Sequence, residues 1–493
     1  MTLRLINSFI ALTLTLSSQA KAVTLKELSD CDRVLTFFGE PNKLLAERLL
    51  GVSEKAADQA QRLMVADDKR LIEIPPELES AMAEFQKYDS SLRRAAIESE
   101  HIIDAGLLSL LSAGHMLVVG GPGNGKSYIV QKMLENILFT KDDPGLSGAA
   151  PLVLRPHRAH TEHMTSLFKL QLTNSTTFSQ LFGNINNRRL FQEDGDHERR
   201  LGQGILTHAF GFLDEFFDAE ARLLRAQLNL LNEREFSEAG ITHYAQTRTV
   251  FATSNYYLPE VYLNAARKQV KLEAVLDRFR YIVFAAKDFA NTGDVGGDNT
   301  YPDNYMALFD IALNSNKYAI SPLHVQSLRL LQQVASQVVV PSTLLGFWKR
   351  VSSRVDSRLA LQQKSAAEEY ARAIKDGEDA EPPYRVTKSM TKRTKGAGAV
   401  ELRALVALDW IRQNGQRPLV ANFTDVLRLQ YFSGLVGNKN HDLDVLIGKA
   451  TNDKEELAML RTVKTERDTF VTCWEEVIDE VFTEFSKLMN SIQ

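Results

Sequence analysis

Short apolar runs alternate with longer stretches of mixed polarity between residues 116 and 284. The runs are rich in β-branched and aromatic residues, which is typical of buried strands in a parallel sheet. The stretch at 128–139 repeats its apolar residues with helical spacing instead. Strands that alternate with helices predict an α/β domain around a parallel sheet. The runs predicted as strands are 116–119, 167–172, 249–253 and 281–284, and the run at 205–213 leads into Asp214-Glu215 at the end of a further buried strand.

Helical patterns flank this region on both sides. Toward the N-terminus they cover residues 25–72 and 77–112, which two prolines separate. Toward the C-terminus, a linker rich in glycine and aspartate at 293–304 leads into a part of the chain where only helical patterns occur. Residues 364–383 are charged and poor in apolar residues, which indicates an exposed extension or a loop. An amphipathic helix or helix pair is predicted from residue 455 onward.

These patterns divide the chain into five parts, and the α/β core is the third. A charged insertion is expected in the fourth part, near 360–385. The parts are a signal peptide or N-terminal helix at 1–22, a helical region at 23–97, the core at 98–290, a linker and helical region at 291–435, and a helical extension at 436–493.

The composition of the 493 residues is that of an ordinary globular protein, with 44% hydrophobic and 24% charged residues. The length allows roughly three domains on the usual size range. A formal net charge of −4 gives no support for a general nucleic-acid surface. The two cysteines, Cys31 and Cys473, lie far apart in the sequence, so they indicate neither a disulfide framework nor a Cys/His metal site.

Residues 120–127 read Gly-Gly-Pro-Gly-Asn-Gly-Lys-Ser, which fits the P-loop (Walker A) pattern. They lie between a predicted strand and a predicted helix, where backbone N–H groups and the helix N-terminus favour a bound phosphate. The alternative is a glycine-rich turn that binds no ligand, and the Gly-Lys-Ser triplet argues against it. The residues expected to bind ATP are Gly120, Gly121, Pro122, Gly123, Asn124, Gly125, Lys126 and Ser127.

Two acidic residues, Asp214 and Glu215, stand at the end of the predicted buried strand that follows the run at 205–213. They match the Walker B pattern and complete the predicted nucleotide site. Lys126 is expected to reach the β- and γ-phosphates, while Ser127 and Asp214 are expected to hold Mg²⁺. Glu215 is placed to act as the general base on a water molecule. Two surface acids at a strand end are the alternative, which the P-loop makes less favourable.

Two further residues are candidates for the same reaction. Asn255 follows the next predicted strand, where its amide can bond the γ-phosphate and the attacking water, although an Asn at a strand end is usually a turn residue. Arg278 precedes the last strand and is a candidate arginine finger for a neighbouring subunit, with Arg280 as the alternative. A surface ion pair is the bland interpretation of either arginine.

A third pattern, His157, His160 and His163, has helical spacing that could present imidazoles to a metal. No cysteine or carboxylate pair accompanies these histidines, so a solvated loop or helix face is the favoured interpretation.

The order of these segments resembles the MoxR branch of the AAA+ ATPases, within the group that carries extra β-hairpins. The similarity covers about 98–289 well and continues patchily to about 427. The segments that carry it are 114–118, Leu172-Thr173-Asn174 through Leu181-Phe182-Gly183, Asp214-Glu215, Asn232-Glu233-Arg234, Ala252-Thr253-Ser254-Asn255, Leu276-Asp277-Arg278-Phe279 and Val338-Val339-Val340-Pro341.

This resemblance implies a P-loop AAA+ core with a helical lid, and a homo-oligomeric ring, usually hexameric, with ATP at the subunit interfaces. It also implies chaperone-like remodelling of partner proteins, often with a partner that carries a von Willebrand factor A domain. The family's second-sensor motif, Ser-Pro-Arg, is missing from this chain. Arg393, just before the helical run from Val400, is the nearest substitute.

Two other functions compete with this one. A DNA-directed AAA+ motor such as a helicase shares the same core, and Lys388, Lys392, Arg393 and Lys395 form a basic run compatible with phosphate contacts. No DNA-binding module is recognisable, so no nucleic-acid partner is expected. A nucleotide-bound adaptor without hydrolysis is the other alternative, and the Asp214-Glu215 pair argues against it.

The first 22 residues leave the compartment open. Arg4, an apolar run at 5–16 and Ala20-Lys21-Ala22 resemble an export signal. The run is diluted by polar residues and too short to span a bilayer. A retained N-terminal helix or a misassigned start are the alternatives. Dependence on ATP favours the cytoplasm, and no transmembrane span is expected.

Overall fold

A computed structural model of the chain describes the α/β core and the helices that pack around it. The predicted segments 1–22, 25–72 and 293–304 lie outside the described residues, as do Asn124 and His160. The described ranges are 74–96, 99–123, 125–141, 152–157, 162–186, 199–238, 240–256, 272–285, 318–340, 342–377 and 392–421, with scattered positions between 425 and 484.

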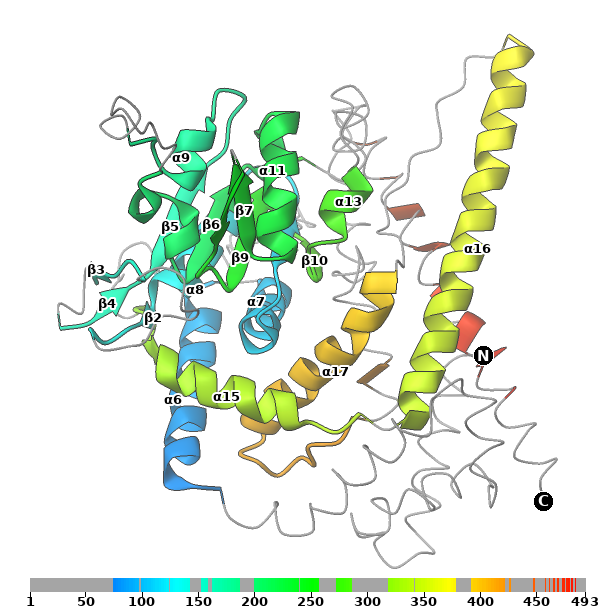
Figure 1. Cartoon of the computed structure of the whole chain (residues 1–493). Coiled ribbons are helices and arrows are strands. Elements are labelled where there is room, and N and C mark those ends of the chain that lie inside the picture. The colour runs from blue at the N-terminus through cyan, green and yellow to red at the C-terminus, as the bar shows by residue number, and fades with distance from the viewer. Residues whose placement is uncertain are drawn as a thin grey trace, which may run out of the picture.

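A five-stranded sheet forms the centre of the described residues, and every neighbouring pair in it is parallel (Figure 1). The strand order is β10-β1-β9-β6-β5. This confirms the parallel sheet predicted from the apolar runs, and the fold is an α/β P-loop AAA+ fold. The strands are β1 (Met116–Val119), β5 (Leu167–Gln171), β6 (Phe210–Asp214), β9 (Thr249–Ser254) and β10 (Tyr281–Phe284).

Helices cover both faces of the sheet, because alternate residues of each buried strand point to opposite sides. In β1, Met116 and Val118 join one core cluster and Leu117 and Val119 join another. The first cluster includes helices α6 (Pro76–Ala95), α7 (Glu100–Ser112), α8 (Lys126–Glu135) and α15 (Val325–Gln337). The second includes α9 (Phe178–Phe182), α11 (Ala221–Asn232) and α13 (Leu272–Leu276), with short 3-10 turns at Ile205–Thr207 and Phe216–Asp218. A further 3-10 turn spans Leu201–Gln203.

The helix after the P-loop is shorter than the predicted 128–139. It ends at Glu135, where the Asn136 side chain donates to the Lys132 carbonyl at 2.8 Å and caps the last turn. The next two residues form β2 (Ile137–Leu138), which pairs in parallel with β11 (Leu323–His324). Both β2 residues are buried, so their apolar character reflects this pairing and not a helix face.

Two antiparallel hairpins were not located by the sequence pattern. One joins β3 (Arg155–Pro156) to β4 (Met164–Thr165), and the other joins β7 (Glu235–Glu238) to β8 (Ile241–Tyr244). The second hairpin lies between α11 and β9, so it connects the segment after Glu215 to the strand that leads to Asn255.

In the described residues the chain after the sheet is mainly helical, as its pattern predicted, apart from the short strand β11. Helix α17 (Lys392–Arg412) packs against α7 and α15, while α16 (Ser342–Lys375) extends away from the core (Figure 1). The N-terminal half of α16 packs against Trp474, Val477 and Val481 from the C-terminal part of the chain. The C-terminal half of α16 is mostly exposed, which agrees with the exposed extension expected from residue 364. None of the helices in the described residues is long and apolar enough to cross a membrane.

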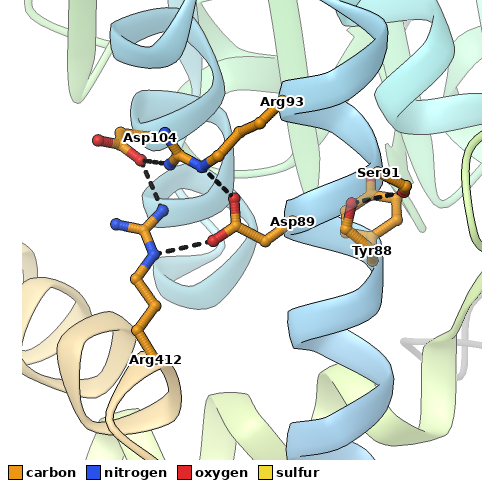
Figure 2. A network of polar contacts seen from close by, with 6 residues as sticks. All are labelled: Tyr88, Asp89, Ser91, Arg93, Asp104 and Arg412. Carbon is orange, nitrogen blue, oxygen red and sulfur yellow. Dashed lines mark hydrogen bonds and ion pairs between the residues drawn. The ribbon is translucent and has the colours of Figure 1, made fainter. Parts of the chain in front are cut away.

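A network of four charged side chains joins α17 to the two helices that precede β1 (Figure 2). Arg412 donates from Nε to Asp89 at 2.8 Å and from Nη2 to Asp104 at 2.6 Å. Arg93 contacts the same two carboxylates. Each carboxylate therefore lies between two guanidinium groups, and α17 is fixed to α6 and α7 by paired charges as well as by apolar packing.

Candidate functional site

The P-loop connects β1 to α8 through backbone conformations that favour glycine. Gly125 has φ 68°, in the left-handed region, immediately before the first helical residue. Gly120 has φ 149°, and a Cβ there would lie 2.3 Å from the carbonyl oxygen of Ala285. The loop therefore begins where the residue after β10 lies too close for a side chain, and it ends at the N-terminus of a helix.

Lys126 is only 4% exposed, so its charge needs polar partners within the protein. Its Nζ donates to the carbonyl oxygen of Gly121 at 2.7 Å and to Oδ1 of Asn255 at 2.9 Å. The lysine of the P-loop is thus held against the residue that follows β9.

Asp214, the last residue of β6, receives two hydroxyl groups on one oxygen. Ser127 Oγ donates to Asp214 Oδ1 at 2.7 Å, and the Thr253 hydroxyl donates to the same atom. The pairing of Ser127 with Asp214 brings together the two residues predicted as metal ligands. Thr253 was not predicted as a site residue, although it stands in the Ala-Thr-Ser-Asn segment that suggested Asn255.

Glu215 adopts a left-handed conformation, with φ 53° and ψ 49°, which turns it away from the strand direction. Its two carboxylate oxygens accept from the side-chain amide of Asn255 and from the Asn255 backbone N–H, the latter at 3.3 Å. Burial raises the pKa of Glu215, and the negative charges of Asp214 and Asp218 raise it further. Asn255 therefore links the lysine of the P-loop to the predicted base.

The two predicted arginines are not part of this set of hydrogen bonds. Arg278 follows α13, and its Nη1 donates to the Ala274 carbonyl at 2.7 Å. It precedes the first residue of β10, so it lies toward the amino edge of the sheet, opposite the carboxyl ends where the other site residues gather. Arg280 also lies there and donates to the Ser112 carbonyl at 3.1 Å. Arg393 belongs to α17, and its side chain is outside the described residues.

Among the described residues, which leave out His160 of the histidine pattern, no group of three side chains suited to a metal is found. The ring of His163 instead packs edge-on against His324, with centroids 5.0 Å apart. His324 in turn bonds Glu84 at 2.7 Å.

Comparison with known proteins supports the same class. Residues 135–289 match the family model described as the MoxR domain in the MoxR-vWA-beta-propeller ternary systems. Two uncharacterized proteins of Methanocaldococcus jannaschii are each 26% identical, one over 201 residues (41% of this chain, 43% of the relative) and one over 209 (42% and 46%). The match thus spans less than half the length of these curated relatives.

Two solved structures are similar at low sequence identity. One is a candidate ATPase from Cytophaga hutchinsonii, 15% identical, with a TM-score of 0.44 over 78% of this chain and 96% of that one. The other is a full-length MCM homolog from Methanopyrus kandleri, 14% identical, with a TM-score of 0.37 over 73% and 61%. The family match and the described fold together support a MoxR-type AAA+ domain in this part of the chain.

Proposed function

We propose that the protein hydrolyses ATP with Mg²⁺ and uses the turnover to remodel or mature partner proteins. The proposal that the site hydrolyses ATP is supported by a cluster of side chains at one edge of the sheet, beside the P-loop. Lys126 and Glu215 both contact Asn255, and Ser127 contacts Asp214. The roles proposed for Lys126, Ser127, Asp214, Glu215 and Asn255 thus fall on side chains that each contact another member of the site.

The donor set beside the P-loop fits a magnesium ion. Ser127 Oγ and Asp214 Oδ1 are 2.7 Å apart, and both are oxygen donors of the kind that Mg²⁺ prefers. In P-loop ATPases the ion neutralises charge on the phosphates when it is bound. We therefore assign Ser127 and Asp214 as its protein ligands.

The remaining residues have complementary roles in the chemistry. Lys126 binds the phosphate oxygens, and the backbone N–H groups of the loop at 120–125 hold the phosphates in place. Glu215 accepts a proton from the water that attacks the γ-phosphorus, while the bond to the bridging oxygen breaks and ADP leaves. Asn255 orients Glu215 and contacts the lysine, which keeps the base and the cation in a fixed relation.

We further propose that the active form is a homo-oligomer, a hexameric ring by family resemblance. Arg278 lies toward the opposite edge of the sheet from its own chain's site, and we propose that it acts on the site of a neighbouring subunit. Arg393 remains the candidate for a second sensor. A partner with a von Willebrand factor A domain is proposed because the matching family is named for such systems. ATP dependence favours the cytoplasm as the compartment.

The test of this function measures nucleotide binding and phosphate release for the full chain. Replacing Lys126 with Ala should weaken ATP binding and abolish turnover. The matched control is Lys132→Ala, which removes a half-buried lysine from the same helix and should leave both properties unchanged. Equal binding and turnover in Lys126→Ala and the parent would contradict the proposal, and DNA-stimulated turnover would support a DNA-directed motor instead.

A further inference from the structure

One buried hydroxyl at the site has no role in the function described so far. Thr253 is 1% exposed, and its hydroxyl donates to Asp214 Oδ1, the same oxygen that accepts from Ser127. We propose that Thr253 is a positioning residue that holds the Asp214 carboxylate in the orientation that binds the metal. This inference rests on the proposed ATPase function.

The register of the sheet places Thr253 beside Asp214. Strands β6 and β9 are parallel neighbours, and Leu213 pairs with Ala252, so the next residue of each strand lies at the same level. Side chains at one level of adjacent strands point to the same face. That face is the one covered by α8, which carries Ser127. The two hydroxyls therefore approach the carboxylate from different elements of the core.

Exposure separates the roles of the two hydroxyls. Ser127 and Asp214 are half-buried, whereas Thr253 is buried behind them on the protein side of the site. Ser127 is thus placed to contact an ion that enters from solvent, while the buried Thr253 hydroxyl donates to the carboxylate. Partners that orient a metal ligand in this way typically change metal affinity about 10- to 100-fold when they are removed.

A purely structural role is the competing explanation, since a buried hydroxyl must find a hydrogen-bond partner in any core. The two explanations differ in what they predict for metal binding. A positioning residue changes how much Mg²⁺ improves nucleotide binding, whereas a structural residue changes folding or changes binding with and without the metal equally.

The experiment uses full-length Thr253→Val, which is nearly the same shape but lacks the hydroxyl, and Thr253→Ser, which retains it. The control is Thr249→Val, because Thr249 is also 1% exposed and lies four residues away on the same face of β9. The affinity of a fluorescent ADP analogue is measured in excess Mg²⁺ and in EDTA, and Mn²⁺ binding to the nucleotide complex is measured by electron paramagnetic resonance.

In Thr253→Val, the factor by which Mg²⁺ increases the affinity for the ADP analogue should be roughly tenfold smaller than in the parent. Mn²⁺ should bind its nucleotide complex correspondingly more weakly. The affinity for the ADP analogue in EDTA should be unchanged. Thr253→Ser and Thr249→Val should match the parent. The inference would be overturned if Mg²⁺ increased the affinity of Thr253→Val for the ADP analogue as much as it does in the parent. It would also be overturned if the substitution weakened that affinity equally with and without Mg²⁺. If Thr253→Val does not fold, Thr253→Ala and Thr253→Ser give the same comparison, since both lack the methyl group. A parent that binds no nucleotide would instead overturn the proposed function.

Discussion

Asn255 holds Glu215 by both oxygens of its carboxylate, through its side-chain amide and its backbone N–H. These bonds favour the ionised form, yet the pKa of Glu215 is raised, because burial and the charges of Asp214 and Asp218 outweigh them. A carboxylate fixed in place and made more basic is suited to accept a proton from water.

The first prediction concerns the pH dependence of turnover. Glu215 must be ionised to act as a base, so kcat/KM should fall as the pH is lowered, at a pH above the ordinary range of a glutamate. Replacing Asp218 with Asn removes one of the charges that raise this pKa, so the acid limb should move to lower pH. The measurement is the pH profile of kcat/KM, with Glu220→Gln, an exposed neighbour, as the control. An acid limb that does not move in Asp218→Asn would contradict the assignment of the base.

The second prediction concerns stability in acid. His115 is buried at the start of β1, where Nδ1 accepts from the Val250 N–H at 3.0 Å and Nε2 therefore donates to the Leu231 carbonyl at 2.8 Å. Burial, with a contribution from the charge of Arg234, lowers the pKa of His115 from 6.5 to about 3. The neutral ring thus connects the P-loop strand to β9 and to the end of α11.

The folded-state pKa of His115 is lower than its unfolded value, so the folded protein binds the proton less readily. Its contribution to stability is present above pH 6.5 and is lost as the pH falls from 6.5 toward 3, by up to about 1.4 kcal/mol for each pH unit. Urea unfolding at pH 7 and pH 5 should show a smaller loss for His115→Gln than for the parent. His243→Gln, on the β7–β8 hairpin, is the control and should lose as much as the parent. Equal losses in all three proteins would contradict this account of His115.

The third prediction concerns assembly. Because Arg278 lies away from its own site, hydrolysis should depend on a neighbouring subunit and turnover per chain should rise with protein concentration. Replacing Arg278 with Ala should lower kcat by roughly 10³- to 10⁵-fold, the range measured for arginine fingers. Mixing this variant with Lys126→Ala, which retains Arg278, should restore part of the activity. Arg280→Ala is the matched control, and if its loss were the larger one, the finger would be assigned to Arg280.

Much of the fold could be predicted from the sequence because buried parallel strands are continuous apolar runs. The runs at 116–119 and 281–284 became β1 and β10 without any change of boundary. The end of α8 was not predicted, since Ile137 and Leu138 continue the helical spacing and only their pairing with Leu323 and His324, far along the chain, makes them a strand. Non-local pairing of this kind leaves no local pattern.

The site shows the same division between local and non-local information. The P-loop and the Asp214-Glu215 pair could be predicted because each is a contiguous motif next to a strand. Thr253 could not, because its importance comes from the register between β6 and β9 and not from its neighbours in sequence. The charged network of Asp89, Asp104 and Arg412 was also missed, since Arg412 lies more than 300 residues from both aspartates.

The most direct test of the account compares ATP binding and ATP hydrolysis in Glu215→Gln. The substitution removes the base but retains a side chain that can bond Asn255, and it leaves Lys126, Ser127 and Asp214 in place. ATP affinity should therefore stay close to that of the parent, while kcat should fall by roughly 10²- to 10⁴-fold. Glu233→Gln, an exposed glutamate at the end of α11, should match the parent in both measurements. Hydrolysis by Glu215→Gln at the parent rate would contradict the central claim that this site hydrolyses ATP with Glu215 as its base.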